Sequence, residues 1–156
     1  MIALIADGLI FVVALVGGFA LLFWTPQPKL KYFKVAAVAG LTSLLVGKLM
    51  SLLYQPSAGR PFEQLGGAAG AAYIDNPGFP SDHALFATVI VVAVYALTGK
   101  KWLTLALALC AIVMCIGRVL ALVHTPLDVA GGIFAGLVGG LWYLTLERQP
   151  QARSKK

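Results

Sequence analysis

Long apolar runs separated by short polar stretches dominate the chain. Five of them approach the ~20 residues that a helix needs to cross a bilayer. These runs cover residues 2–24, 35–54, 81–97, 102–123 and 126–146. The pattern therefore predicts an all-α fold, a polytopic membrane helical bundle with about five transmembrane helices. A long connection, residues 55–80, precedes the third run.

The composition agrees with a membrane protein. Hydrophobic residues make up 60% of the chain, charged residues 12%, and the mean hydropathy is +0.88. These values are far from the averages of soluble domains. The first run lacks a basic leading region and is longer than the apolar core of a signal peptide, so we expect it to be a retained span. We expect residues 1–156 to form a single integral-membrane domain.

Basic residues follow the first, third and fifth runs. They are Lys29, Lys31, Lys34, Lys100, Lys101, Arg148, Arg153, Lys155 and Lys156. By the positive-inside rule these segments, including the basic tail 147–156, are cytoplasmic and the N-terminus is outside. Trp24, Trp102 and Trp142 fall at the same inner boundary, as an interfacial aromatic belt would. The net charge of +6 therefore indicates topology and contact with anionic lipids, and no nucleic-acid partner.

Two polar islands hold both histidines of the chain. The first is Pro80-Ser81-Asp82-His83, and the second runs from Gly117 to Asp128. In the second, Thr125 and Pro126 predict an N-cap and a first helical position, which places Asp128 in the first turn of the last helix. Asp128 stands four residues after His124, so its carboxylate can hold the imidazole ring and leave the other ring nitrogen free. Both islands are expected at the outer membrane face.

Further polar residues lie near the same face. Ser81 is expected to cap the third span, beside His83, where the free N–H groups of a helix start attract anions. Arg60 lies in the long loop, which we expect to be flexible, with Phe62, Tyr73 and Phe79 dipping into the interface. Lys48 lies about two turns inside the second span and either snorkels outward or reaches an anion.

Three other features have local explanations. Asp7 lies near the outer end of the first span. Hydration at the membrane interface explains this charge, and a functional role would explain it equally well. Gly132, Gly136 and Gly140 follow the small-xxx-small pattern of close helix contact. Cys110 and Cys115 are expected to be apolar packing residues.

The outward groups together predict a metal-independent phosphoryl transfer site, without a cofactor. Cations and a helix N-terminus suit a multiply charged anion, and two histidines match a nucleophile and a general acid. A zinc site is the competing interpretation, but three cations around a divalent ion are unfavourable and no HExxH spacing is present. The predicted site residues are Lys48, Arg60, Ser81, His83, Arg118, His124 and Asp128.

These residues resemble the motifs of the membrane-bound type 2 phosphatidic acid phosphatases, namely Lys…Arg-Pro, Pro-Ser-Gly-His and Ser-Arg-x₅-His-x₃-Asp. Arg118, His124 and Asp128 fit the third motif, with Gly117 in place of its serine. The second motif is fitted by Pro80-Ser81-Asp82-His83, with aspartate where glycine is usual. Arg60-Pro61 fits the end of the first motif, while Lys48 stands farther away than that motif places its lysine.

The resemblance implies a role for each residue. His124 would attack phosphorus and form a phosphohistidine, held by Asp128, and His83 would protonate the leaving oxygen. The phosphoryl oxygens would be bound by Lys48, Arg60, Ser81 and Arg118. The Pro-Ser-Asp-His form is similar to that of bacterial undecaprenyl-diphosphate phosphatases, which implies a lipid diphosphate substrate at the outer face of a bacterial plasma membrane.

Two alternatives remain open at this stage. Phosphatidic acid or phosphatidylglycerophosphate could be the substrate, because family members with similar motifs act on these lipids. A non-catalytic membrane protein that binds phospholipid head groups is the alternative from another functional class. The sequence does not indicate an oligomeric state.

Overall fold

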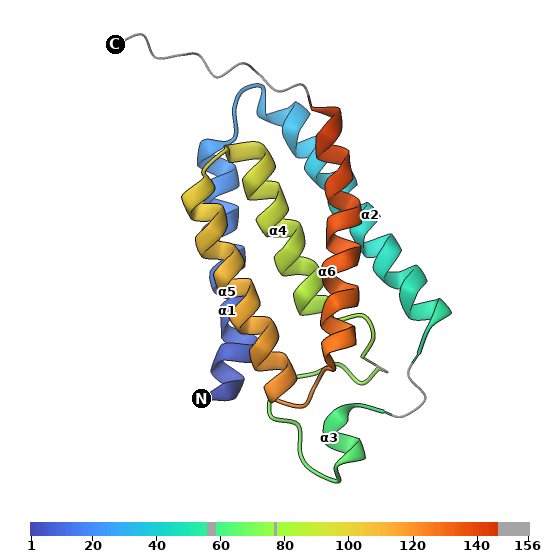
Figure 1. Ribbon diagram of the computed structural model, residues 1–156. Helices are drawn as coiled ribbons and strands as arrows, with labels where there is room; N and C mark the ends of the chain where they lie inside the picture. The colour runs from blue at the N-terminus through green and yellow to red at the C-terminus, as the bar shows by residue number, and fades with distance from the viewer. Residues whose placement is uncertain (56–58, 77, 147–156) are drawn as a thin grey trace.

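The computed structural model describes residues 1–55, 59–76 and 78–146, so the basic tail 147–156 lies outside the described residues. Within them the chain forms helices and contains no strand. The helices are α1 (Ile2–Trp24), α2 (Lys29–Leu53), α3 (Pro61–Gln64), α4 (Asp82–Thr98), α5 (Lys101–Leu120), α6 (Pro126–Gly140) and the 3₁₀ helix η1 (Leu141–Thr145). Figure 1 shows the long helices side by side, with α3 and its loop covering the end where α4 and α6 begin.

Four helical segments are long and apolar enough to cross a membrane: Ile2–Trp24, Lys29–Leu53, Lys101–Leu120 and Pro126–Thr145. The helix α4 is apolar but shorter, with 17 residues. Each of the five predicted runs therefore forms a helix. Four of them reach the length of a span by this measure, and α4 falls short of it.

The start of α2 corrects one sequence expectation. Lys29, Lys31 and Lys34 were expected in a connection, but α2 already begins at Lys29 and includes all three. Only a short segment after Trp24 separates α1 from α2, and the Lys29 ammonium donates to the Leu22 carbonyl. The lysines still lie at one end of the bundle, because Lys100 stacks over the Trp24 ring, with 5.6 Å between its Nζ and the ring centroid.

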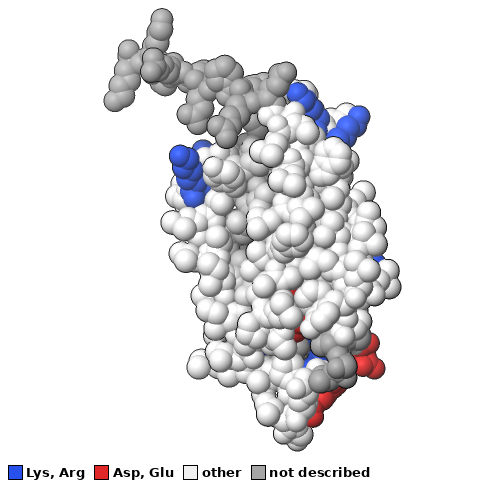
Figure 2. Space-filling model, turned by 45° about the vertical axis from the view of Figure 1, so that its right-hand side comes forward, with Lys and Arg blue, Asp and Glu red and all other residues white. Residues whose placement is uncertain are grey.

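Charge is sorted along the long axis of the molecule. In Figure 2, lysine and arginine side chains gather at one end, acidic side chains gather at the other, and the flank between them is almost free of both. Many large apolar side chains on the long helices are exposed, among them Phe11, Phe19, Leu41, Leu105 and Phe134. An exposed apolar flank between two polar ends is the surface expected of a helical bundle within a bilayer.

The helix α4 packs against α1, α2, α5 and α6 and so forms the centre of the bundle. Glycines on α6 make the contact with α4 close. A Cβ atom on Gly136 would lie 2.7 Å from Thr88 Cβ, and one on Gly140 would lie 2.8 Å from Val92 Cγ1. This confirms the prediction that the glycines spaced by four are packing residues.

Part of the long loop is attached to the turn between α5 and α6. The Phe62 N–H donates to the Leu122 carbonyl at 3.1 Å, and the Gly70 N–H donates to the Ala121 carbonyl at 3.0 Å. Phe62 and Phe79 are buried, whereas Tyr73 is exposed. Burial of the two phenylalanines stabilises the loop against the protein, so they do not dip into the interface as expected.

Candidate active site

The two polar islands meet through a backbone hydrogen bond. The Ser81 N–H, at the start of α4, donates to the carbonyl of Asp128 in the first turn of α6, with 2.9 Å between N and O. Gly132 permits this approach, because a Cβ atom there would overlap the Ser81 carbonyl and lie 2.9 Å from Ala84 Cβ. Close packing of α4 on α6 therefore brings together residues that are far apart in sequence.

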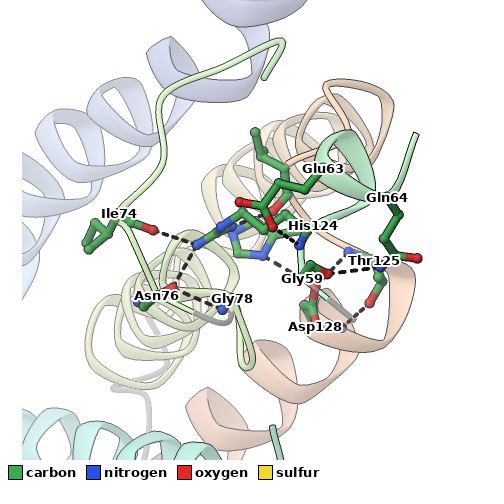
Figure 3. A network of polar contacts seen from close by, with 11 residues as sticks. Gly59, Glu63, Gln64, Ile74, Asn76, Gly78, His124, Thr125 and Asp128 are labelled. Atoms are coloured by element: carbon green, nitrogen blue, oxygen red, sulfur yellow. Dashed lines mark hydrogen bonds and ion pairs between the residues drawn. The ribbon is translucent and has the colours of Figure 1, made fainter. Parts of the chain in front are cut away.

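His124 and Asp128 have the local geometry that their spacing predicts. The distance between His124 Nδ1 and Asp128 Oδ2 is 3.6 Å, and Figure 3 shows the ring facing the carboxylate. Asp128 Oδ2 also accepts from the Thr125 N–H at 2.7 Å, and Thr125 Oγ1 accepts from the Asp128 N–H at 3.2 Å. This capping box confirms Thr125 as the N-cap of α6. It holds the carboxylate beside the imidazole.

Arg60 is held by the loop around it and is 4% exposed. Its Nη1 donates to the Val123 carbonyl at 2.5 Å, and its Nη2 donates to the Ile74 carbonyl at 2.9 Å and to Asn76 Oδ1 at 2.7 Å. The acceptors Ile74 and Asn76 are drawn in Figure 3. Burial lowers the pKa of the Arg60 guanidinium, and the carboxylates of Asp128 and Glu63 oppose this shift. An arginine titrates so far above neutral pH that Arg60 remains a cation.

A cavity of about 390 Å³ lies among these groups. Its polar lining consists of Arg60, Tyr73, Asn76, Asp82, His83, Arg118 and His124. The apolar part of its wall includes Ile10 of α1 and Phe86 of α4, and Phe86 is 46% exposed. Both histidines and two arginines therefore face one cavity, as the sequence predicted.

Buried polar atoms without a hydrogen-bond partner are concentrated here. Six such side-chain atoms occur among the described residues, and four belong to predicted site residues: Arg60 Nε, Ser81 Oγ, Arg118 Nε and His124 Nδ1. An unpaired buried polar atom costs roughly 1–3 kcal/mol, so native proteins usually pair such groups. Ser81 begins α4 as predicted, but its hydroxyl does not cap the helix. His124 Nδ1 faces the Asp128 carboxylate at 3.6 Å, so the two arginine Nε atoms and the Ser81 hydroxyl are the ones that remain free to bind a polar ligand.

The structure does not bring Lys48 to the cavity. Its neighbour Gly47 faces α4, where a Cβ atom would lie 2.7 Å from Leu85 Cδ1. Successive residues of a helix point about 100° apart, so Lys48 is directed away and is exposed. Lys48 is not among the residues that line the cavity, so we leave it out of the proposed site, and phosphoryl binding by Lys48 stays a prediction.

Sequence comparison identifies the family of this chain. The model of the PAP2 superfamily matches residues 29–151. The chain belongs to the PAP2 superfamily. The match includes both polar islands and the loop with Arg60, which supply the polar lining of the cavity.

Two curated relatives of this PAP2 chain extend the comparison. The bacitracin transport permease protein BcrC of Bacillus licheniformis is 35% identical over 113 residues, which are 69% of this chain and 51% of BcrC. The putative undecaprenyl-diphosphatase YbjG of Escherichia coli K12 is 31% identical over 137 residues, 88% of this chain and 67% of YbjG. The chain thus spans about half the length of BcrC and two thirds of YbjG. No solved structure matches the chain significantly.

Two residues that sequence reasoning did not place in the PAP2 site lie in it or beside it. Asn76 Oδ1 accepts from Arg60 and from the Gly78 N–H, at 3.0 Å in the latter case. Asp7 lies within 2.5 Å of Arg118. Asn76 stood in a loop without a motif, so no sequence signal indicated it. The signal for Asp7 was its charge inside a span.

Proposed function

We propose that this PAP2 chain is a membrane lipid phosphatase that hydrolyses a polyprenyl diphosphate, undecaprenyl diphosphate, to the monophosphate. The observation that carries the proposal is that Arg60 and Arg118, each with a buried Nε that has no hydrogen-bond partner, line one cavity with both histidines. The unpaired Ser81 hydroxyl belongs to the residue between Pro80 and Asp82, which line the same cavity. Two guanidinium groups and a hydroxyl suit the oxygens of a phosphoryl group. The printed name of YbjG supports the choice of substrate.

The two histidines divide the reaction into two steps. His124 attacks the terminal phosphorus through Nε2, and the bond from that phosphorus to the bridging oxygen breaks. His83 protonates this oxygen, so the lipid monophosphate leaves and a phosphohistidine remains. Water then attacks the phosphohistidine, transfers a proton to His83 and releases inorganic phosphate. Asp128 orients the His124 ring and stabilises its positive charge throughout.

The positions of the arginines support direct electrostatic stabilisation by the protein. Arg60 and Arg118 are each almost fully buried, and charges act more strongly where water is excluded. Two fixed cations at the cavity make it a poor place for a divalent cation. We therefore propose that catalysis needs no metal.

The wall of the cavity supports a substrate that is anchored in lipid. Ile10 of α1 and Phe86 of α4 line it, and Phe86 is exposed. A head group can thus reach the polar wall while the chain that carries it stays in the hydrocarbon. With Lys48 outside the cavity, the choice of a diphosphate rests on the relatives and on the two arginines.

Lysine placement supports an orientation in which the site faces outward. The start of α2 and the α4–α5 connection, which carry lysines, lie at one end of the bundle, and the start of α4 lies at the other (Figure 1). Asp82 and His83, at that start of α4, line the cavity. By the positive-inside rule the lysine end is cytoplasmic. We propose a bacterial plasma-membrane protein with its N-terminus outside, and the C-terminal tail would be cytoplasmic.

The test is phosphate release by purified protein in detergent micelles from undecaprenyl diphosphate, phosphatidic acid and phosphatidylglycerophosphate. We expect turnover that His124→Ala abolishes and Asp128→Asn weakens greatly. A tenfold higher kcat/KM for either glycerolipid would refute the diphosphate preference, a gap of about 1.4 kcal/mol. No release from any lipid would favour a non-catalytic lipid-binding protein.

A further inference from the structure

Asp7 of α1 is bound to a predicted phosphate-binding arginine. Asp7 Oδ1 and Arg118 Nη1 are 2.5 Å apart, and Asp7 Oδ2 accepts from the Ala72 N–H at 2.9 Å. The same Nη1 donates to the Ala72 carbonyl at 2.8 Å. The three residues come from α1, the long loop and α5, and they form a closed ring of hydrogen bonds.

This ring uses one edge of the guanidinium and leaves the other edge free. Both hydrogens of Nη1 are engaged, one by Asp7 and one by Ala72. Arg118 Nε is buried without a partner, and Nη2 makes no hydrogen bond among the described residues. Two parallel N–H groups on one guanidinium edge match two oxygens of a phosphoryl group.

A local departure from the family motif allows this contact. Gly117 stands where the related motif has serine, and a Cβ atom there would lie 3.0 Å from Ile5 Cγ2 and 3.2 Å from the Ala6 nitrogen. The absence of a side chain at Gly117 lets α1 approach α5 and brings Asp7 to Arg118. Asp7 precedes the residues 29–151 that match the PAP2 superfamily, so the match does not account for it.

We propose that Asp7 is a positioning residue that acts through Arg118. It binds the Nη1 edge, fixes the guanidinium plane at the cavity wall and presents the Nε–Nη2 edge to a phosphoryl or similar tetrahedral oxyanion. Without Asp7 the long side chain of Arg118 can rotate. The oxyanion then binds more weakly, because the side chain must be ordered when it binds. This inference rests on the proposed function for its kinetics, and anion binding tests it separately.

The experiment compares wild type, Asp7→Ala, Arg118→Ala and the double variant in matched detergent micelles with undecaprenyl diphosphate. A displacement of about 1 Å in a positioning group can cost about a hundredfold in rate. We therefore expect Asp7→Ala to lower kcat/KM on the order of tenfold or more. In the Arg118→Ala background Asp7→Ala should cause no further loss, because the two residues act as one unit.

Asp75→Ala is the matched control. Asp75 is an exposed carboxylate in the same outer loop and makes no hydrogen bond or ion pair among the described residues. We expect it to retain wild-type kcat/KM. If Asp7→Ala fails to fold, Asp7→Asn replaces it. Asparagine keeps one oxygen for Arg118 but presents an N–H group to the Ala72 N–H. We therefore expect Asp7→Asn to lower kcat/KM, but by less than Asp7→Ala.

A second readout does not need turnover. Vanadate should raise the thermal midpoint of the wild type. The vanadate concentration that gives half of this rise should be about tenfold higher in Asp7→Ala. It should not differ between Arg118→Ala and the double variant. Independent losses from Asp7→Ala and Arg118→Ala, or wild-type values for Asp7→Ala, would overturn the inference while leaving the phosphatase function intact. A wild type that binds vanadate through this pair but releases no phosphate would overturn the function alone. A wild type that neither binds vanadate nor releases phosphate would overturn both the inference and the function.

Discussion

Gly132→Ala tests whether the contact between α4 and α6 builds the site. The new methyl group would overlap the Ser81 carbonyl and lie 2.9 Å from Ala84 Cβ and 3.0 Å from the Leu85 nitrogen. The tightest of these contacts is with the Ser81 carbonyl oxygen, whereas carbon and oxygen atoms approach only to about 3.3 Å, so the two helices must separate by roughly 1 Å. Two of these three neighbours are backbone atoms of α4 or its N-cap, which cannot rotate away.

Gly132→Ala should lower both the stability of the protein and its kcat. Overpacking of this kind typically costs ~1–3 kcal/mol, which corresponds to a fall of several degrees in the thermal midpoint of a chain of this size. The separation also stretches the hydrogen bond from the Ser81 N–H to the Asp128 carbonyl and moves His83 away from His124. We expect kcat to fall on the order of tenfold or more, because small displacements of reacting groups are costly.

Gly18→Ala provides the matched control for this variant. It is the same change inside a helix, but a Cβ atom at Gly18 has no neighbour within 4 Å. Alanine is favoured over glycine in a helix by about 0.8–1.0 kcal/mol, so we expect a slightly higher midpoint and unchanged kcat. The assays are thermal unfolding in detergent and phosphate release. A Gly132→Ala protein with wild-type midpoint and kcat would refute the reasoning.

Three further predictions follow from the site and the orientation. Arg60→Lys should lower kcat/KM at least about tenfold, because one ammonium cannot replace the fork that binds two loop carbonyls and Asn76; a value within twofold of wild type would contradict this. Activity should persist in chelator and be inhibited by vanadate as a transition-state mimic, whereas complete loss in chelator, restored by one divalent ion, would show a metal requirement. In intact cells, with the native cysteines changed to alanine, an impermeant thiol reagent should label Ala68→Cys but not Lys101→Cys, and the reverse pattern would overturn the topology.

Features set by neighbouring residues could be predicted from the sequence. The apolar runs predicted every long helix, because the cost of exposing polar backbone in a bilayer makes a long apolar segment helical. Thr125, Pro126 and Asp128 predicted the start of α6, since a capping box needs only residues three apart. The same local spacing placed Asp128 beside His124.

Contacts between distant segments required the tertiary structure. Arg60 reaches the Val123 carbonyl across 63 positions, and Asp7 reaches Arg118 across 111. Gly47 turns toward α4 and thereby directs Lys48 away from the cavity. Each outcome depends on how far one helix rotates and how closely it approaches its neighbour, which is set by the packing of many side chains at once. The sequence alone therefore determined the helices and the chemistry of the two islands, while helix packing decided which charged residues share the cavity.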